Sequence, residues 1–197
     1  MSPGVTFERV YRELKRRLAD GTLKPGQPIE PTQMSAELAA SITPIRDALH
    51  RLVGERLVEA PNHNGFRVPR LTEAELRDLY RWNGLLLGLA IRQIHPNALS
   101  TIIPASPDRN IDTGTADLFQ QIAKATSSAE HARTVGQLNE RLAPCRRAEA
   151  QVLDSVVEEL GAIRMLLQTA ERSQLSRALT RYHLRRASAA PAILAAL

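Results

Sequence analysis

Turn signals divide the first 70 residues into three short amphipathic segments, and this pattern restricts the fold more than any other feature of the chain. Apolar side chains at spacings of three and four over residues 7–18 predict a helix, which Gly21 ends. A second helix is predicted over residues 32–40. Thr43 and Pro44 open a third, because threonine caps helix N-termini and proline fits the first helical turn. The N-terminal part is therefore predicted to hold three short helices.

A β-hairpin is predicted to follow the third helix. Arg56–Ala60 alternates apolar and polar residues as a half-buried strand does, and Phe66–Val68 forms the return strand before Pro69. Between them lies Asn64-Gly65, a strong short-range signal for a hairpin turn. Three helices followed by a hairpin form a winged helix-turn-helix, a fold whose third helix can enter the major groove of DNA.

The pattern from residue 72 onward is helical. Thr72 to Glu75 form a capping box at the start of its first helix. Residues 95–114 contain three prolines and predict a long surface connection. Asp154 and Ser173 are the predicted N-caps of the last two long helices.

These patterns together predict a mainly α protein of two domains. Residues 1–71 form a winged helix-turn-helix of three helices plus a β-hairpin, and residues 72–197 form an all-α helical bundle. The apolar tail over residues 187–197 either packs on a partner or frays.

Composition and motif content exclude several classes of protein. Neither a run of about 20 apolar residues nor a secretory signal occurs, so we expect a cytoplasmic protein without a membrane partner. The net charge of +5 suggests a weak preference for polyanions, while aromatic residues, at 4 %, are too scarce for stacking single-stranded bases. No phosphate-binding glycine loop, GxSxG elbow or paired metal-ligand motif is present, so we expect no enzyme and no cofactor. The single cysteine, Cys145, excludes an internal disulfide, and its neighbours Arg146 and Arg147 leave a redox switch as a minor hypothesis.

Four motifs within residues 7–71 resemble the DNA-binding domain of GntR-type transcription regulators. They are LKPG at 23–26, ELA at 37–39, TPIRDALHRL at 43–52 and LVE at 57–59, ahead of the glycine-containing wing. The resemblance implies a sequence-specific transcription regulator, which we expect to be a repressor that binds double-stranded DNA. It also implies a homodimer on a pseudo-palindromic operator.

The same resemblance indicates which residues contact DNA. Arg46 keeps its family position and is the best candidate for a base or phosphate contact, whereas Ile42 and Thr32 stand where family members carry arginine. Losing both arginines should change the operator sequence or shift readout toward the wing and DNA shape. His50 lies far along the helix, which favours packing at the surface. The expected DNA-binding residues are Thr32, Ser41, Thr43, Arg46, His50, Arg51, His63, Asn64, Gly65 and Arg67.

The C-terminal part resembles, more weakly, the FCD-type helical domain of the FadR-like branch, through residues 79–90, 117–125 and 175–184. This resemblance implies that residues 72–197 dimerise and bind an effector that alters DNA affinity.

The metal site of that branch is degenerate in this sequence. Many members hold a metal on one aspartate and three histidines, and a metal site needs several donors that converge on one point. The matching positions here are Ala116, Gln120, Leu160 and His183. We therefore expect no metal, with a rebuilt site around His131 and Asp117 as the alternative.

Residues 82–89, WNGLLLGL, are unusually apolar, and Asn83 and Leu87 replace an arginine and a glutamate of the family. A cavity there would favour an uncharged or hydrophobic effector, but the segment could equally form a dimer seam. The expected effector-binding residues are Asn83, Gln120 and His183. A ligand-independent regulator or adaptor, which uses the helical domain only for protein contacts, is the alternative function, and a small helical enzyme is a third.

Overall fold

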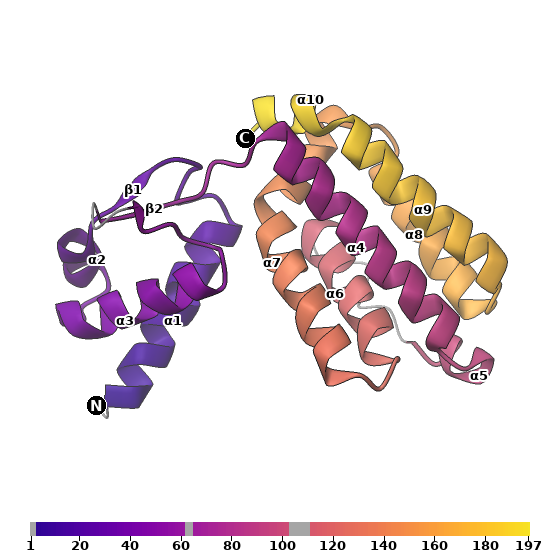
Figure 1. Cartoon of the computed structure of the whole chain (residues 1–197), viewed down its shortest axis with the longest axis horizontal. Coiled ribbons are helices and arrows are strands. Elements are labelled where there is room, and N and C mark those ends of the chain that lie inside the picture. The colour runs from indigo at the N-terminus through magenta and orange to yellow at the C-terminus, as the bar shows by residue number, and fades with distance from the viewer. Residues whose placement is uncertain (1–2, 62–64, 103–110) are drawn as a thin grey trace. The chain divides into compact units, whose positions relative to one another are not determined.

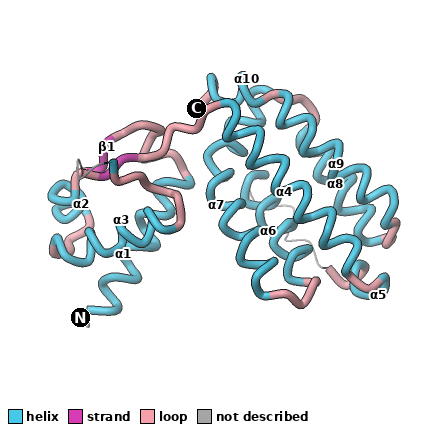
Figure 2. Tube along the Cα trace, viewed as in Figure 1, coloured by secondary structure: helices cyan, strands magenta, loops and turns pink. Residues whose placement is uncertain are grey.

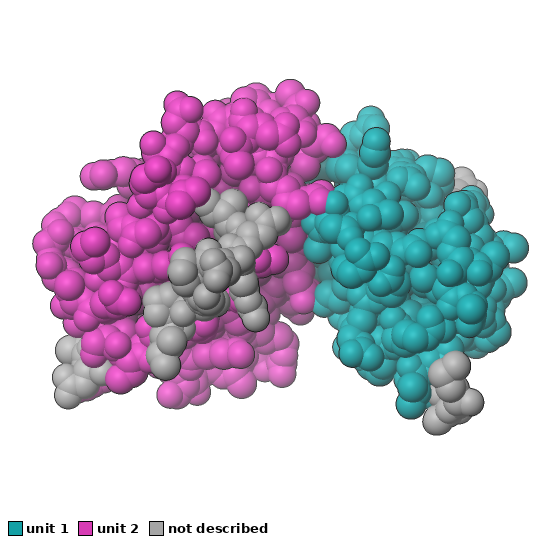
Figure 3. Space-filling view, turned by 180° about the vertical axis from the view of Figure 1, so that it is seen from behind, with its two compact units in different colours: residues 1–71 teal, residues 72–197 magenta. Residues whose placement is uncertain are grey.

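The computed structural model describes residues 3–61, 65–102 and 111–197. The expected DNA-binding residues His63 and Asn64 lie outside this part of the chain. The molecule divides into two compact units, Met1–Leu71 and Thr72–Leu197, which are distinguished by colour in Figure 3. Each unit has its own apolar core.

The first unit contains helices α1 (Pro3–Ala19), α2 (Pro31–Glu37) and α3 (Ile42–Gly54) and strands β1 (Pro28–Ile29) and β2 (Phe66–Arg67) (Figure 1). Helices α1 and α3 pack on each other because each carries an apolar stripe at helical spacing. The buried residues of this core include Val10, Leu14, Ile45, Leu49 and Leu52. The winged helix-turn-helix expected from the sequence is therefore observed.

The wing differs in detail from the predicted hairpin. β2 pairs antiparallel with β1, with Ile29 opposite Phe66, so the main partner strand lies before α2. The strand predicted over Arg56–Ala60 is reduced to one bridge, in which the backbones of Glu59 and Arg67 exchange two hydrogen bonds of 2.9 Å. Arg56 has a φ of 59°, a left-handed conformation that interrupts an extended strand.

The start of α3 lies two residues earlier than predicted. Ser41, with extended backbone, is the N-cap, so the assignment of Thr43 to that position was wrong. Pro44 still lies in the first turn, where its missing N–H costs no helical hydrogen bond. The shift leaves Thr43 on the helix, with its side chain exposed.

The second unit is a bundle of helices (Figure 2). Helix α4 begins at the predicted capping box, in which the Glu75 backbone N–H donates to the Thr72 hydroxyl and the Thr72 backbone N–H donates to the Glu75 carboxylate. Buried residues of α4, α6, α7, α8 and α9 form one core around Phe119 and Leu87. The helices are α4 (Glu73–Gln93), α5 (Pro96–Leu99), α6 (Ile111–Lys124), α7 (Ala129–Val152), α8 (Val156–Gln168), α9 (Arg172–Ser188) and α10 (Ala190–Ala195).

Several local predictions for this unit were wrong. The N-caps of α8 and α9 are Ser155 and Glu171 rather than Asp154 and Ser173. The connection predicted over residues 95–114 contains α5 and the first turn of α6.

The C-terminal tail packs within its own unit through α10, where Ala190 and Ile193 are buried. In the described part of the chain, no helix is long and apolar enough to cross a membrane.

Candidate nucleic-acid interface

The candidate interface is built on the outward face of α3. Ile45, Ala48, Leu49 and Leu52 bury one face of the helix in the core. The 3.6-residue period then turns a second set of side chains outward. These exposed residues are Thr43, Arg46, Asp47 and His50. Among the described residues no hydrogen bond or ion pair holds the Arg46 side chain, so its guanidinium projects into solvent.

The N-terminus of α3 adds unpaired backbone donors beside this face. Ser41 is exposed and its hydroxyl makes no capping hydrogen bond to the first turn. The N–H groups of a first turn have no intrahelical partner, and the helix dipole places positive potential there. Ser41 and Thr43 hydroxyls next to such donors suit an anion such as a phosphate. Ile42 is 43 % exposed and presents an apolar side chain at the same end.

Arg51 is held on the opposite flank of α3, against α1. Its guanidinium lies 4.0 Å from the centroid of the Tyr11 ring. It also makes ion pairs of 3.3 Å with Glu8 and with Glu55. The structure therefore separates Arg51 from Arg46, although both were expected to contact DNA.

A polar cluster that sequence reasoning missed fixes α3 to α1. The Tyr11 hydroxyl donates to Glu55 over 2.6 Å and accepts from the Lys15 ammonium over 3.0 Å. Burial and the neighbouring Glu55 raise the pKa of Tyr11. The only sequence signal was the four-residue spacing of Tyr11 and Lys15, because Glu55 is distant in the chain.

The wing lies next to the end of the exposed α3 face. Gly65 has a φ of 80°, which glycine adopts without strain, and Phe66 then enters the core. The His50 ring meets the Phe66 ring edge-on, with 5.0 Å between centroids. This contact is the surface packing that the sequence favoured for His50. Arg67 pairs through its backbone, and its side chain is exposed on the wing.

A second glycine fixes the turn that leads into β1. Gly26 has a φ of 79°, and a Cβ at this position would lie 2.9 Å from Nη2 of Arg70. The missing side chain therefore allows both the left-handed turn and the approach of the Arg70 guanidinium. The Gly26 backbone N–H donates to the carbonyl of Val68 over 2.9 Å, which joins this turn to the wing.

Helix α2 precedes α3, and Thr32 is exposed in its first turn. Two of the arginines of α1, by contrast, are paired with carboxylates. Arg16 donates to Glu13 over 2.7 Å, and Arg17 donates to Glu13 over 2.9 Å. These two hydrogen bonds lower the pKa of Glu13 to about 2.

In the helical unit, two of the three expected effector-binding residues bind each other. Asn83 and His183 are buried, and His183 Nε2 lies 2.8 Å from Asn83 Oδ1. His183 Nδ1 lies 2.7 Å from the Leu179 carbonyl, which can only accept, so Nδ1 carries the proton. Desolvation lowers the pKa of His183 to about 3, so the imidazole is neutral and Nε2 carries no proton. Nε2 can then accept only when the Asn83 amide is turned to present Nδ2, which otherwise has no partner. Gln120 lies apart from this pair and donates to the Ala132 carbonyl over 2.9 Å.

A buried cluster around Glu149 joins four helices of the same unit, α4, α7, α8 and α9. Arg186 donates to Glu149 over 2.6 Å and to Glu159 over 2.7 Å. Tyr80 donates to the other oxygen of Glu149 over 2.7 Å. The carboxylate of Glu149 is thus held by α4 and α9 at once, and the side-chain pattern of α7 alone did not predict it.

Arg146 is buried without a carboxylate partner among the described residues. Its guanidinium donates to the Asn139 side chain over 2.8 Å and lies 5.6 Å from the centroid of Phe119. Arg146 Nε has no hydrogen-bond partner, and neither has the buried Tyr182 hydroxyl, whose ring also packs on Phe119. Polar groups in this state are costly, and a bound polar molecule would satisfy them.

The structure also bears on the metal and redox hypotheses. In the described ranges no three side chains of His, Cys, Asp or Glu converge as metal ligands. His131 and Asp117 therefore belong to no such group there. Cys145 is buried, and burial raises the pKa of its thiol to about 12. The expectation that neighbouring arginines activate this thiol was wrong, because desolvation outweighs their charge.

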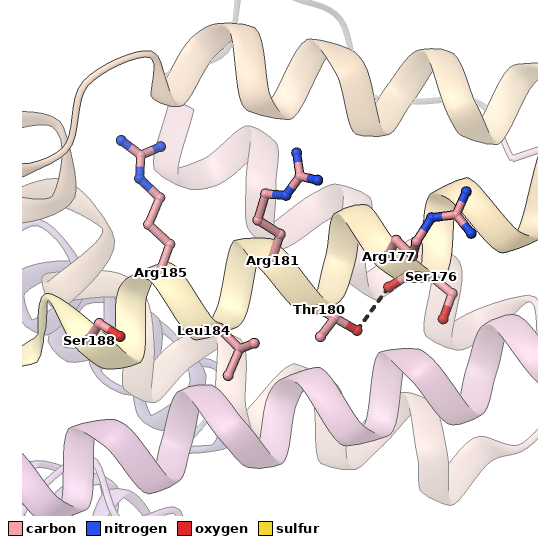
Figure 4. A pocket seen from close by; sticks show the side chains of 7 residues that line it. All are labelled: Ser176, Arg177, Thr180, Arg181, Leu184, Arg185 and Ser188. Carbon is pink, nitrogen blue, oxygen red and sulfur yellow. Dashed lines mark hydrogen bonds between the residues drawn. The ribbon is translucent and has the colours of Figure 1, made fainter.

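An open groove runs along the surface of α9 (Figure 4). It is bordered by Ser176, Arg177, Thr180, Arg181, Leu184, Arg185 and Ser188. Figure 4 shows Arg181 and Arg185 pointing to one side, while Leu184 and Thr180 point to the other side, toward α4. One helix supplies all of these side chains, so the groove does not enclose a ligand.

Taken together, an exposed helix face, a free helix N-terminus and an adjacent wing define a helix-turn-helix domain of the winged class. Residues 6–68 match the family model described as bacterial regulatory proteins, gntR family. This part of the chain is therefore similar to the winged helix-turn-helix domain of that family.

Two proteins similar to this chain are named as HTH-type transcriptional regulators. The chain is 32 % identical over 92 residues to YdhC of Bacillus subtilis (strain 168), an uncharacterized HTH-type transcriptional regulator, which covers 47 % of this chain and 41 % of YdhC. It is 34 % identical over 85 residues to the HTH-type transcriptional repressor GlaR of Escherichia coli (strain K12), covering 41 % of this chain and 39 % of GlaR. The chain thus matches about two fifths of the length of these relatives.

The fold of the whole chain also has a counterpart among solved structures. A transcriptional regulator GntR from Rhodococcus sp. RHA1 superposes with a TM-score of 0.77 at 18 % identity, over 97 % of this chain and 98 % of that chain. The likeness concerns the fold, and it extends across both units.

Proposed function

We propose that this chain is a sequence-specific DNA-binding transcription regulator that acts as a homodimeric repressor. The exposed α3 face with Arg46 at its centre is the observation that carries the proposal. An α-helix fits the major groove of B-DNA, and its N-terminal residues reach the base edges. Arg46 lies one turn into α3, where such contacts are made, and we assign Thr43 and Ser41 to the neighbouring phosphate.

Direct readout by this helix rests on few side chains. Arg46 is the outward-facing cation of α3 that keeps a free guanidinium, since Arg51 is engaged by Glu8, Glu55 and Tyr11. Ile42 supplies an exposed apolar group, which suits the methyl group of thymine. Arg67 on the wing and Thr32 on α2 then serve as backbone contacts that fix the register.

A homodimer would double the small number of base contacts that one α3 helix can make. One recognition helix covers only a few base pairs, and two copies related by a two-fold axis read a pseudo-palindrome. We assign dimerisation to the helical unit, which would act as the effector-binding part as well.

Support for an effector comes from the groups around Phe119. The buried Arg146 guanidinium has neutral partners in the described residues, and Arg146 Nε and the Tyr182 hydroxyl are unpartnered. These groups favour a small molecule with hydrogen-bond acceptors, such as a carboxylate, over the uncharged or hydrophobic effector that the sequence suggested. The apolar segment that led to that expectation turns Trp82, Leu85 and Leu89 outward, away from the core.

DNA binding is tested by gel retardation with the DNA upstream of the protein's own gene. We expect retardation at nanomolar to micromolar protein that weakens as salt rises, since phosphate contacts release counterions. Unrelated DNA of the same length is the control and should bind more weakly. No retardation at low salt, or equal binding of both fragments, would refute sequence-specific binding.

Effector binding is tested by thermal unfolding with acetate, succinate and citrate at millimolar concentration. We expect one of them to raise the unfolding temperature of the wild type but not that of Arg146→Met, because only a ligand held by Arg146 depends on its charge. If none stabilises the wild type, the ligand-independent regulator or adaptor replaces the sensing role.

A further inference from the structure

An exposed stripe on α4 has the side-chain spacing of a helix–helix interface. Its members are Asp78, Trp82, Leu85, Leu89 and Arg92, all exposed and separated by alternating steps of four and three residues. That spacing places side chains along the seam of a coiled coil. The centre of the stripe is apolar and its two ends carry opposite charges. Trp82, Leu85 and Leu89 are 47 %, 64 % and 38 % exposed, so a large apolar surface faces water.

The stripe is complementary to itself when two copies run antiparallel. We propose that α4 pairs with α4 of a second copy about a two-fold axis at Leu85. In this register Leu85 meets its own counterpart, and each position lies opposite the one equally far from Leu85 on the other copy. Asp78 is seven residues before Leu85 and Arg92 is seven residues after it. Asp78 of each copy therefore lies opposite Arg92 of the other copy.

Charge selects the antiparallel arrangement. A parallel pairing would place Asp78 beside Asp78 and Arg92 beside Arg92 of the other copy, which is repulsive. The antiparallel pairing instead forms two Asp78–Arg92 ion pairs, one at each end of the seam. Within the described residues neither side chain is engaged in an ion pair, so both are available for these contacts.

Shape supports the same register. Trp82 is three residues before Leu85 and Gly88 is three residues after it, so each tryptophan lies over a glycine of the partner. A Cβ built on Gly88 meets nothing within 4 Å, and the surface above it is open. The other glycine of this segment, Gly84, is covered by His183 and lies on the inner side of α4. Trp82, the bulkiest side chain of the seam, therefore lies opposite the Gly88 backbone of the other copy, which no side chain covers.

The surface is large enough for a stable pair of subunits. The 21 residues of α4 span about 31 Å. Leu184 of α9 is 58 % exposed and points toward α4, so it widens the apolar surface (Figure 4). A strip of this length and about 20 Å in width covers roughly 600 Å² per copy, near the typical value of about 800 Å² for a specific interface.

A second exposed apolar stripe, on α8, serves as the control. Val157 and Met165 are 66 % and 65 % exposed there. α8 exposes two large apolar side chains where α4 exposes three, and Arg164 beside Met165 is only partly exposed, so this stripe is the smaller of the two.

The proposal rests on the homodimer of the proposed function and names its interface. Sedimentation equilibrium of the full chain should give twice the monomer mass of 21.8 kDa at micromolar concentration. Leu85→Asp, which brings two carboxylates together at the axis, should yield a monomer with unchanged helical content by circular dichroism. Val157→Asp on α8 should remain dimeric.

Charge exchange tests the register without relying on one disruptive variant. Asp78→Arg and Arg92→Asp should each weaken the dimer at least about tenfold, because each places like charges at both ends of the seam. The double variant should recover to within about threefold of wild type. A monomeric wild type, a double variant no stronger than the single ones, or dissociation by Val157→Asp alone would overturn the proposal. DNA is absent from this assay, so a dimer that binds no DNA would refute the proposed function and leave the interface standing.

Discussion

The neutral, buried state of His183 makes the stability of the helical unit depend on pH. Its imidazole binds Asn83 and the Leu179 carbonyl inside the bundle, and desolvation lowers its pKa to about 3. An unfolded histidine has a pKa of about 6.5. Below pH 6.5 the unfolded chain therefore takes up a proton that the folded chain rejects. The stability from this residue is complete above pH 6.5 and is lost as the pH falls toward 3.

The magnitude follows from the two pKa values. Between pH 6.5 and pH 3, each pH unit removes about 1.4 kcal/mol, so lowering the pH from 7 to 5 should cost about 2 kcal/mol. Trp82, the single tryptophan, lies in α4 and reports on this unit alone. Urea unfolding followed by its fluorescence, at one protein concentration, gives the free energy of unfolding at each pH.

A variant separates this residue from other titrating groups. His183→Gln should be less stable at pH 7 but should lose about 2 kcal/mol less than wild type between pH 7 and pH 5. Ser173→Ala changes an exposed residue at the start of the same helix, leaves His183 in place and should keep the wild-type slope. If His183→Gln and wild type show the same pH dependence, the buried neutral imidazole is not the cause and the reasoning fails.

Three further predictions follow from the packing. Arg186→Met should destabilise the helical unit by about 3–5 kcal/mol, because it leaves a buried carboxylate unpaired, whereas Arg133→Ala breaks an exposed ion pair and should cost less than about 1 kcal/mol in the same urea titration. Gly26→Ala should destabilise the first unit by about 1 kcal/mol, since it puts a side chain on a backbone with positive φ and displaces the Arg70 guanidinium, and it should lower the transition seen by circular dichroism while the tryptophan transition stays in place. Gly54→Ala, where a Cβ meets open space, is its control, and equal effects of the two would contradict the steric argument. Cys145 should react with a thiol reagent at pH 8 only after unfolding, and labelling of the native protein at the unfolded rate would contradict its burial.

Periodicity predicted the elements whose stability is local. The buried stripe of α3 and the capping box of α4 were both readable, because helical spacing and caps are set by residues close in sequence. The sequence did not indicate β1, a two-residue strand too short for alternation that exists only because β2 pairs with it. The helix starts at Ser41 and Ser155 were also missed, since neither side chain makes a capping bond.

The site was predictable in position but not in its contacts. Sequence pattern placed Arg46 on an exposed helix face. It grouped Arg51 with Arg46, because the aromatic ring of Tyr11 that holds Arg51 comes from another helix. In the helical unit, Asn83 and His183 lie 100 residues apart and meet only in the fold. Their hydrogen bond replaces the shared ligand contact that the sequence suggested.

The most direct test of the account measures the affinity of Arg46→Ala for the upstream DNA, beside wild type and Arg133→Ala, by fluorescence anisotropy over a series of salt concentrations. Loss of the one free guanidinium that α3 turns outward should weaken binding about 5- to 150-fold, and Arg133→Ala, on the helical unit, should bind as wild type does. A smaller salt dependence in Arg46→Ala would identify a phosphate contact, and a selective loss on the upstream fragment would identify a base contact. Wild-type affinity and salt dependence in Arg46→Ala would contradict the assignment of α3 as the helix that reads DNA.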